Sequence, residues 1–219
     1  MLDAVLSLIA PHMCLQCQAE GSLWCGVCRS AAPTPAERCY RCHALSPDDR
    51  TCKRCRSNSP LYSVQAATRY EGYAKQLVWK LKFVRAKAAA VTLAEIMADR
   101  ITPAVNSVIV PVPTSSGRVR QRGYDQAVLV ARHFACQTGC EYVPALVRLG
   151  QQQQRTATRA QRLSQLAQAY TVPRPELVAG KPVVLIDDVI TTGATLEAAA
   201  RALKASGARR VSAIVFAQA

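Results

Sequence analysis

One stretch near the C-terminus constrains the fold more than any other part of the chain. The apolar run at residues 182–186 is followed by an acidic pair, and the small residues 191–195 then lead into a helix-like segment at residues 196–206. Residues 210–216 have the pattern of a further buried strand. Strands that alternate with helices build a mostly parallel sheet, and ligands bind at the carboxyl ends of its strands. The sequence therefore predicts an α/β fold with its binding site next to residues 191–195.

The same alternation continues upstream, but it does not reach the first sixty residues. The further segments are a strand at 62–70, a helix in which Ala74, Leu77, Val78 and Leu81 recur at helical spacing, a strand at 108–112 and a helix at 126–136, while Gly207 ends the last helix. Before Pro60 there is no long hydrophobic period, so that part of the chain needs a staple to fold. We therefore expect a cysteine-rich module over residues 1–60 and an α/β domain over residues 61–219.

Eight of the ten cysteines form four C-x-x-C pairs within the first sixty residues. The pairs are Cys14 and Cys17, Cys25 and Cys28, Cys39 and Cys42, and Cys52 and Cys55. Each pair presents two thiolates from a tight knuckle, and two knuckles complete one tetrahedral site, so we predict a double zinc ribbon with two structural zinc ions. The spacing fits pairing between neighbouring knuckles, and interleaved pairing stays open. Disulfides and a redox C-x-x-C are less favoured alternatives.

The N-terminus predicts neither a secretory signal nor a membrane anchor. Residues 1–10 are mostly apolar, but they lack a basic region and a cleavage site and are too short to span a bilayer. We therefore expect a cytoplasmic protein without a membrane span. Cys136 and Cys140 lie outside the paired pattern and are interpreted as core or free thiols. The glutamine tract at residues 151–154 is interpreted as a mobile loop.

Residues 191–195, which we call the phosphate loop, have the composition of an anion-binding site. Backbone N–H groups converge at the start of a helix, where free donors and the helix dipole stabilise an anion. Gly193 allows the backbone to approach a phosphate closely, while Asp187 and Asp188 can accept hydrogen bonds from sugar hydroxyls. An ordinary strand, turn and helix with threonine caps is the alternative, and it accounts for less of this pattern.

The chain is strongly basic, with a formal charge of +14 from 28 lysines and arginines and 14 acidic residues. Residues 1–60 account for +2 of this charge and residues 61–219 for +12, so the α/β domain is the better candidate for binding polyanions. Three arginines alternate at Arg118, Arg120 and Arg122, and we expect them to lie along one side of an extended loop that binds pyrophosphate or nucleic acid. Lys80 and Lys82 add positive charge nearby. A solvated basic loop is the alternative.

Residues 183–195 resemble the signature of type I phosphoribosyltransferases, which bind phosphoribosyl pyrophosphate (PRPP). The resemblance implies that Asp187 and Asp188 are the catalytic pair and contact the ribose. It implies that the 5′-phosphate is held by Thr191, Thr192, Gly193, Ala194 and Thr195. In that family Mg²⁺ is bound by the pyrophosphate and ribose hydroxyls, and a nucleophilic nitrogen displaces pyrophosphate at C1. Catalysis rests mainly on positioning and charge stabilisation.

Several motifs together are similar to those of the competence-associated ComF family, in particular its members with a double zinc ribbon. They are the four cysteine knuckles, Lys82-Phe83, Pro-Val-Pro113 with the Arg-x-Arg-x-Arg-Gly-Tyr-Asp-Gln that follows, and Asp187-Asp-Val-Ile-Thr-Thr-Gly193. The resemblance implies a role in DNA uptake during natural transformation, with single-stranded DNA, PRPP and other DNA-uptake proteins as partners. The chain departs from the family at Asp125, where asparagine is usual. It departs again where the family's Arg-x-x-Asn-x-x-x-Ala-Phe element reads Arg162-Leu-Ser-Gln165-Leu-Ala-Gln-Ala169-Tyr170, and the segment before Arg162 is shortened.

Three functions fit these patterns to different degrees. The first is a DNA-handling protein with a PRPP-type pocket, which the whole set of motifs favours. The second is a salvage phosphoribosyltransferase that acts on a free base, although the cysteine-rich module offers no evident pocket for stacking that base. The third is a zinc-ribbon scaffold or transcription protein, which leaves the phosphate loop unexplained. If the site turns over, the reaction is a glycosyl transfer of the phosphoribosyltransferase type.

Overall fold

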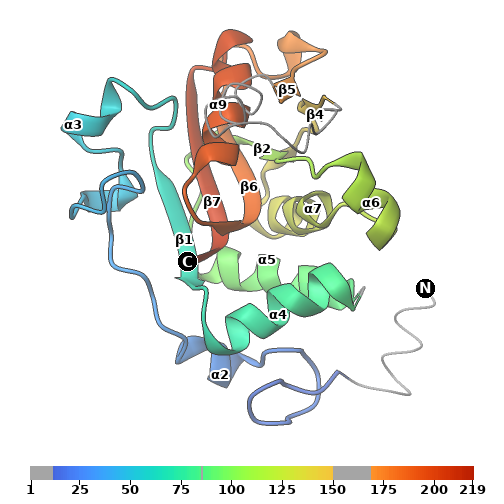
Figure 1. The fold of residues 1–219 in the computed structure, drawn as a ribbon. Helices are drawn as coiled ribbons and strands as arrows, with labels where there is room; N and C mark the ends of the chain where they lie inside the picture. Colours follow the sequence, from blue (N-terminus) through green and yellow to red (C-terminus); the bar gives the residue numbers. More distant parts are fainter. Residues whose placement is uncertain (1–11, 85, 150–168) are drawn as a thin grey trace, which may run out of the picture.

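The computed structural model of the chain describes residues 12–84, 86–149 and 169–219 (Figure 1). Two short helices, α2 and α3, and a 3₁₀ turn, η1, lie in the cysteine-rich part, and the remaining elements form the α/β part. In chain order the elements are α2 (Gly26–Ser30), η1 (Pro47–Asp49), α3 (Lys53–Arg56), β1 (Val64–Arg69), α4 (Gly72–Phe83), α5 (Ala88–Arg100), β2 (Val108–Pro111), α6 (Ser116–Arg122), α7 (Gln126–Thr138), β3 (Glu141–Tyr142), β4 (Val147–Arg148), β5 (Tyr170–Thr171), η2 (Pro175–Leu177), β6 (Pro182–Ile190), α9 (Ala194–Ala205) and β7 (Arg210–Gln218). The predicted alternation of strands and helices is confirmed.

The central sheet is parallel and has the strand order β1-β7-β6-β2-β3. From β2 the chain continues to β3, at one edge of the sheet, whereas from β6 it continues to β7, in the opposite direction across the sheet. The connections therefore diverge between the neighbouring strands β2 and β6. Such a switch point leaves a crevice at the carboxyl ends of the two strands. The last pair between these strands is Pro111 with Ile186, whereas β6 continues to Ile190 along β7. The end of β6 therefore has an open edge beside this crevice.

Helices cover both faces of the sheet (Figure 1). Helices α4, α5 and α7 pack on one face, around core residues such as Leu81, Leu93 and Phe134, and α9 packs on the other face through Leu196 and Leu203. Side chains along β6 alternate between these layers, because successive strand residues point to opposite faces. Val184 and Ile186 belong to the first layer and Val183 and Leu185 to the second. The apolar run that predicted a buried strand thus contributes apolar side chains to both faces of the sheet.

The two cysteine groups pack on different parts of the α/β unit. Arg29, in α2, forms ion pairs of 2.8 Å with Glu95 and 3.1 Å with Asp99 of α5. Arg100, at the end of α5, donates to the Ala67 carbonyl oxygen of β1 and to the carbonyl oxygens of Arg29 and Ala32, which follow the first four cysteines. The second cysteine segment contacts α9 instead, through Tyr40. The division of the chain at residue 60 stays a prediction.

Two sequence expectations about local structure are wrong. The strand predicted to end at residue 186 continues through Asp187 and Asp188 to Ile190, because residues 187–190 still pair with β7. The arginines expected on an extended loop lie in α6, which ends where Gly123 adopts a left-handed conformation with φ of 82°. The glutamine tract at 151–154 and the segment around Arg162 lie outside the described residues. Within the described parts of the chain, every helix is too short or too polar to cross a lipid bilayer.

Candidate phosphoribosyl site

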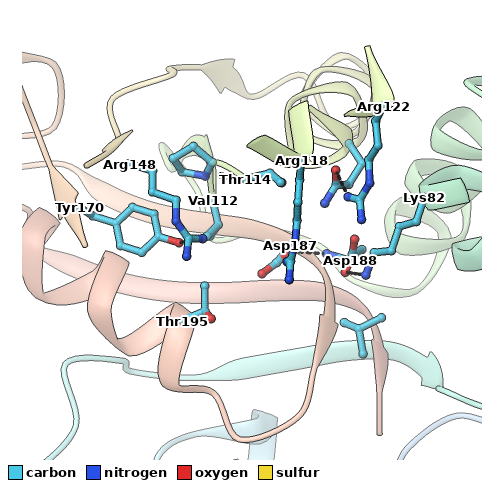
Figure 2. Close-up of a pocket in the computed structure, with 13 residues that line it drawn as sticks. Lys82, Val112, Thr114, Arg118, Arg122, Arg148, Tyr170, Asp187, Asp188 and Thr195 are labelled. Atoms are coloured by element: carbon cyan, nitrogen blue, oxygen red, sulfur yellow. Dashed lines mark hydrogen bonds and ion pairs between the residues drawn. The ribbon is translucent and has the colours of Figure 1, made fainter. Parts of the chain in front are cut away.

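A cavity of about 190 Å³ opens at the switch point between β2 and β6 (Figure 2). Most of its lining is charged or polar, and the residues come from α4, from the chain after β2, from α6 and α7, from the β4–β5 hairpin and from β6 and α9. The lining residues are Lys82, Val112, Pro113, Thr114, Arg118, Arg122, Gln126, Arg148, Tyr170, Asp187, Asp188, Val189 and Thr195. Four cationic side chains therefore surround two carboxylates, which is a suitable environment for a ligand that carries both phosphates and hydroxyls.

The two aspartates approach this cavity from opposite faces of β6. Asp188 follows the face that packs on α4 and α7, and its Oδ1 accepts a hydrogen bond of 2.8 Å from the ammonium group of Lys82. Only 4% of Asp188 is exposed, and within the described residues its Oδ2 has no hydrogen-bond partner. A buried acceptor without a partner is costly unless a ligand supplies the missing donor. The geometry of Asp188 thus fits a role as acceptor for a ligand hydroxyl.

Asp187 carries an unfavourable charge in this position. Burial raises the pKa of its carboxyl group to about 8, and the negative charge of Asp188 contributes to the same shift. Its Oδ1 accepts a hydrogen bond of 2.8 Å from the backbone N–H of Asp188, which opposes the shift. The two carboxylates therefore repel each other, and hydroxyl donors or a cation from a ligand would relieve that repulsion.

The phosphate loop borders a smaller cavity of about 50 Å³, which is lined by residues 191–196 together with Asp187, Val189 and Ile190. Both cavities are lined by Asp187, Val189 and Thr195, so they adjoin. Gly193 is the N-cap residue of α9 and has a φ of 76°, a left-handed conformation that side chains with a Cβ rarely adopt. The first turn of α9 thus presents its backbone donors to the small cavity, as the sequence predicts for a phosphate.

The three predicted arginines lie on two different sides of helix α6. Arg118 and Arg122 are four residues apart in α6, so they share one helix face, and both line the larger cavity. Arg122 also donates to Gln126 Oε1 at 2.7 Å. Arg120 lies about 200° around the helix from both, is exposed and does not line this cavity. Lys82 lines the cavity, whereas Lys80, two residues earlier in α4, does not.

Sequence reasoning missed two residues of the cavity wall, Arg148 and Tyr170. They are directly paired in the β4–β5 hairpin, where Arg148 donates to the Tyr170 hydroxyl at 3.2 Å and its guanidinium lies 5.5 Å from the ring centroid. Burial raises the pKa of Tyr170 to about 12. Each strand of the hairpin has only two residues, which is too short to give a periodic signal.

Asp125, the departure from the family pattern, has a structural role at the start of α7. Its Oδ1 accepts from the backbone N–H of Ala127 at 3.0 Å, and its Oδ2 accepts from that of Thr114 at 2.8 Å. The carboxylate therefore caps the helix and also holds the chain that follows β2. Asparagine offers only one acceptor oxygen, so aspartate satisfies both backbone donors where asparagine satisfies one.

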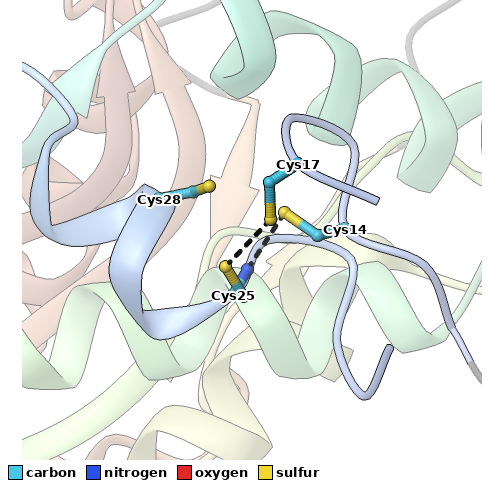
Figure 3. Close-up of side chains that lie close together, drawn as sticks. All are labelled: Cys14, Cys17, Cys25 and Cys28. Atoms are coloured by element: carbon cyan, nitrogen blue, oxygen red, sulfur yellow. Dashed lines mark hydrogen bonds between the residues drawn. The ribbon is translucent and has the colours of Figure 1, made fainter. Parts of the chain in front are cut away.

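The eight paired cysteines form two separate groups of four. Cys14, Cys17, Cys25 and Cys28 make up the first group (Figure 3), and Cys39, Cys42, Cys52 and Cys55 make up the second. Within each group the ligand atoms all lie within 4.8 Å of one another. All ten cysteines are free, and four convergent thiols with no disulfide fit a tetrahedral zinc site. The neighbouring knuckles are paired, which settles the alternative that the spacing left open.

The family model for the phosphoribosyl transferase domain matches residues 83–219, which is more than half of the chain. The chain belongs to this family. The matched residues include the phosphate loop, the acidic pair and α6, and they begin directly after Lys82. The predicted α/β phosphoribosyltransferase fold with two N-terminal cysteine groups is thereby confirmed.

Curated relatives of this phosphoribosyltransferase-family chain have names that concern DNA. The DNA utilization protein YhgH of Salmonella typhi is 29% identical over 224 residues, covering 93% of this chain and 96% of the relative. The competence protein ComFC of Bacillus subtilis is 35% identical over 109 residues, covering 50% of this chain and 43% of the relative. The resemblance to the ComF family is confirmed. Among solved structures, the B. subtilis glutamine PRPP amidotransferase matches 59% of this chain and 26% of its own, with 23% identity and a TM-score of 0.44.

We predict that the purified chain contains two zinc ions, one in each cysteine group, because four thiolates complete one tetrahedral site. Cys17→Ser and Cys42→Ser each remove one ligand from a different group, and each variant should retain about one zinc ion. Metal analysis by mass spectrometry of the protein measures this, with Cys136→Ser as a control that should keep both ions. Disulfides in place of metal in the wild-type protein would contradict the prediction.

We also predict that Asp187→Asn stabilises the chain. The raised pKa means that the folded state holds a proton that the unfolded chain releases, so wild-type stability falls as the pH rises from about 4 to about 8. The asparagine variant escapes this loss. Its melting temperature should therefore exceed that of the wild type at pH 8 by at least about 2 °C, and the difference should shrink toward pH 5.

Asp188→Asn serves as the control for this measurement. This variant replaces the carboxylate that pairs with the Lys82 ammonium group by a neutral amide. It should therefore lower the melting temperature rather than raise it. Thermal unfolding followed by circular dichroism from pH 5 to pH 9 distinguishes the two variants. A melting temperature of Asp187→Asn below that of the wild type across this range would show that the carboxylate is not strained.

Proposed function

We propose that the cavity and the phosphate loop together bind PRPP. The observation that carries this proposal is the division of charge across the site, with an acidic pair between a helix N-terminus and a set of cations. In this arrangement the phosphate loop takes the 5′-phosphate, and Asp187 and Asp188 accept hydrogen bonds from the ribose hydroxyls. Arg118 and Arg122 lie across the cavity from the loop and take the pyrophosphate.

Mg²⁺ fits this site as a companion of the ligand. The carboxylates offer hard oxygen atoms next to the expected position of the pyrophosphate and ribose, and Asp188 Oδ2 lacks a partner among the described residues. When bound, the cation neutralises charge on the pyrophosphate, which makes it a better leaving group. The protein itself holds the ribose between the acidic pair and the loop and directs Arg118 and Arg122 at the charge that develops on the leaving group.

Calorimetric titration of PRPP with and without Mg²⁺ tests this proposal. Arg118→Ala and Arg122→Ala should each weaken binding at least about tenfold, because a hydrogen bond to a charged group contributes about 1.5–3 kcal/mol. Arg120→Ala removes the same charge from the outer face of α6 and should change affinity by less than about twofold. Equal effects of all three variants would mean that only net charge matters and that the assigned positions are wrong.

We further propose that the chain binds single-stranded DNA and acts in DNA uptake in the cytoplasm, in line with the names of its curated relatives. The basic cavity rim supports this proposal, and so does an aromatic pair beside it on α4. Trp79 and Phe83 are 54% and 63% exposed, their ring centroids are 6.3 Å apart, and the Arg122 guanidinium lies 5.7 Å from the Phe83 centroid. Exposed rings next to cations are the elements from which sites for unpaired bases are built.

Tyr124, the aromatic residue that follows α6 and Gly123, is held by other contacts. Its hydroxyl donates to the Leu81 carbonyl oxygen, and the side chain is partly buried against the core. Trp79 and Phe83, rather than Tyr124, are therefore the candidates for base stacking in this proposal. Both lie on the same face of α4, because they are four residues apart.

Fluorescence anisotropy with an oligothymidylate at several salt concentrations separates the two contributions. Arg118→Ala with Arg122→Ala should flatten the slope of log affinity against log salt by about 0.7 for each phosphate that is no longer neutralised. Trp79→Ala with Phe83→Ala should lower affinity at least about fivefold and leave the slope unchanged, because stacking releases no counterions. Val105→Ala, an exposed apolar residue before β2, is the control. Unchanged slope and affinity in both double variants would place the DNA site elsewhere.

A salvage phosphoribosyltransferase is the alternative that the same cavity allows. Among the described lining residues Tyr170 is the only aromatic, and it is already in contact with Arg148. Release of pyrophosphate from PRPP in the presence of a free purine or pyrimidine base, and not in its absence, would support this alternative. Binding of PRPP without such release supports ligand binding as the function of the site.

A further inference from the structure

The second cysteine group contacts the phosphate loop through Tyr40. This residue lies between Cys39 and Cys42 in one knuckle, is 5% exposed, and packs in the same core as Ile190 and Leu196. A Cβ built on Gly193 would lie only 2.9 Å from two carbons of the Tyr40 ring. The ring therefore lies directly against the N-cap residue of α9, and the close approach depends on glycine at position 193.

Polar contacts fix the same knuckle to the first turn of α9. The Tyr40 hydroxyl donates to Glu197 Oε1 at 2.8 Å, and Arg41 forms an ion pair of 3.2 Å with the same oxygen. Glu197 is 8% exposed, and its other carboxylate oxygen is paired with Arg201 at 2.7 Å. A carboxylate in the first turn of a helix is favoured by the helix dipole, and here it is also held by two residues that lie more than 150 residues earlier in the chain.

The backbone on both sides of Tyr40 is held by the cysteine group. Cys39 and Cys42 are two of the four thiols that converge, and the knuckle is closed by hydrogen bonds from Cys39 N–H to the Ala44 carbonyl oxygen and from His43 N–H to that of Cys39. A metal ion bound by the group would fix Cys39 and Cys42 at once, and thereby the position of Tyr40 between them. Without the ion, the turn would be held by hydrogen bonds and ion pairs alone, among them a bond of 2.7 Å from the Arg38 guanidinium to the His43 carbonyl oxygen.

We infer that Tyr40 and Arg41 are positioning residues for the phosphate loop, and that metal binding at the second cysteine group sets the affinity of the loop for a phosphate ester. This inference rests on the proposed function, in which the loop holds the 5′-phosphate of PRPP. The first cysteine group offers an internal contrast, because its Arg29 is paired with Glu95 and Asp99 of α5 rather than with α9. Loss of metal from the two groups should therefore have different consequences for the loop.

The test compares Cys42→Ser with Cys17→Ser in the full chain, since each thiol is exposed and each variant disables one group. Cys42→Ser should weaken PRPP binding, measured calorimetrically with Mg²⁺, at least about fivefold, while Cys17→Ser should stay within about twofold of the wild type. Hydrogen exchange of residues 193–197, measured without any ligand, should be at least about fivefold faster in Cys42→Ser alone. Metal analysis of both variants confirms that each has lost one zinc ion.

Substitutions of Tyr40 separate positioning from a general loss of structure. Tyr40→Phe keeps the ring against Gly193 and loses the hydroxyl bonds to Glu197 and Ser59, so its exchange rate and affinity should lie between those of the wild type and Tyr40→Ala. Arg41→Ala should behave like Tyr40→Phe, because it removes the other contact to the same carboxylate oxygen. Should Tyr40→Ala fail to fold, these two variants carry the test.

Equal exchange rates at residues 193–197 in Cys42→Ser and Cys17→Ser would overturn the inference, as would wild-type exchange in both Tyr40→Phe and Arg41→Ala. The exchange measurement needs no ligand, so it stands apart from the proposed function. If the wild-type chain does not bind PRPP, the proposed function fails, and the exchange rates still decide whether the knuckle controls the loop.

Discussion

The register between β2 and β6 is the constraint on which the site depends. Because their pairing ends at Pro111 and Ile186, the last four residues of β6 have, among the described residues, a strand neighbour only on the β7 side. The acidic pair falls in this stretch, where a strand still fixes its direction but one edge is open. A strand residue directs its side chain more firmly than a loop residue does, so the carboxylates are held rigidly on either side of β6. Extension of β2 by two residues would pair it with Asp187 and Asp188 and close the edge beside them.

The charges of the site are only partly balanced among the described residues. Four cations and two carboxylates come together from segments that are far apart in the chain, and the pKa of Asp187 is raised because its negative charge is disfavoured there. Strained charges of this kind are typical of sites where a ligand completes the set of contacts. The ion pair between Lys82 and Asp188 resolves part of the conflict and joins α4 to β6. A ligand that brings hydroxyls or a cation, as proposed above, would relieve the part of the conflict that remains.

Local sequence patterns predicted the functional residues that are contiguous in the chain. They did not predict those that come together only in the folded structure. The strand, acidic pair, phosphate loop and helix lie within one stretch, so composition and spacing revealed them. The alternation of Arg118, Arg120 and Arg122 suggested an extended loop, and α6 gives no helical period because Val119 is its only apolar residue. The contact between Tyr40 and Glu197 spans 157 residues, and the pair of Arg148 with Tyr170 depends on two strands of only two residues each. A single sequence has no signal for either.

The position of β7 in the sheet has a consequence for how the chain is made. This strand is the last described element to leave the ribosome, yet it lies between β1 and β6. During synthesis β1 can pair with β7 only after almost 150 further residues have been added, since Val64 pairs with Ala213. Contacts so far apart in sequence slow folding, because the intervening chain must be ordered first. The cysteine-rich segment, by contrast, has all eight thiols available early, so a metal ion that these thiols can hold would bind long before the sheet has formed.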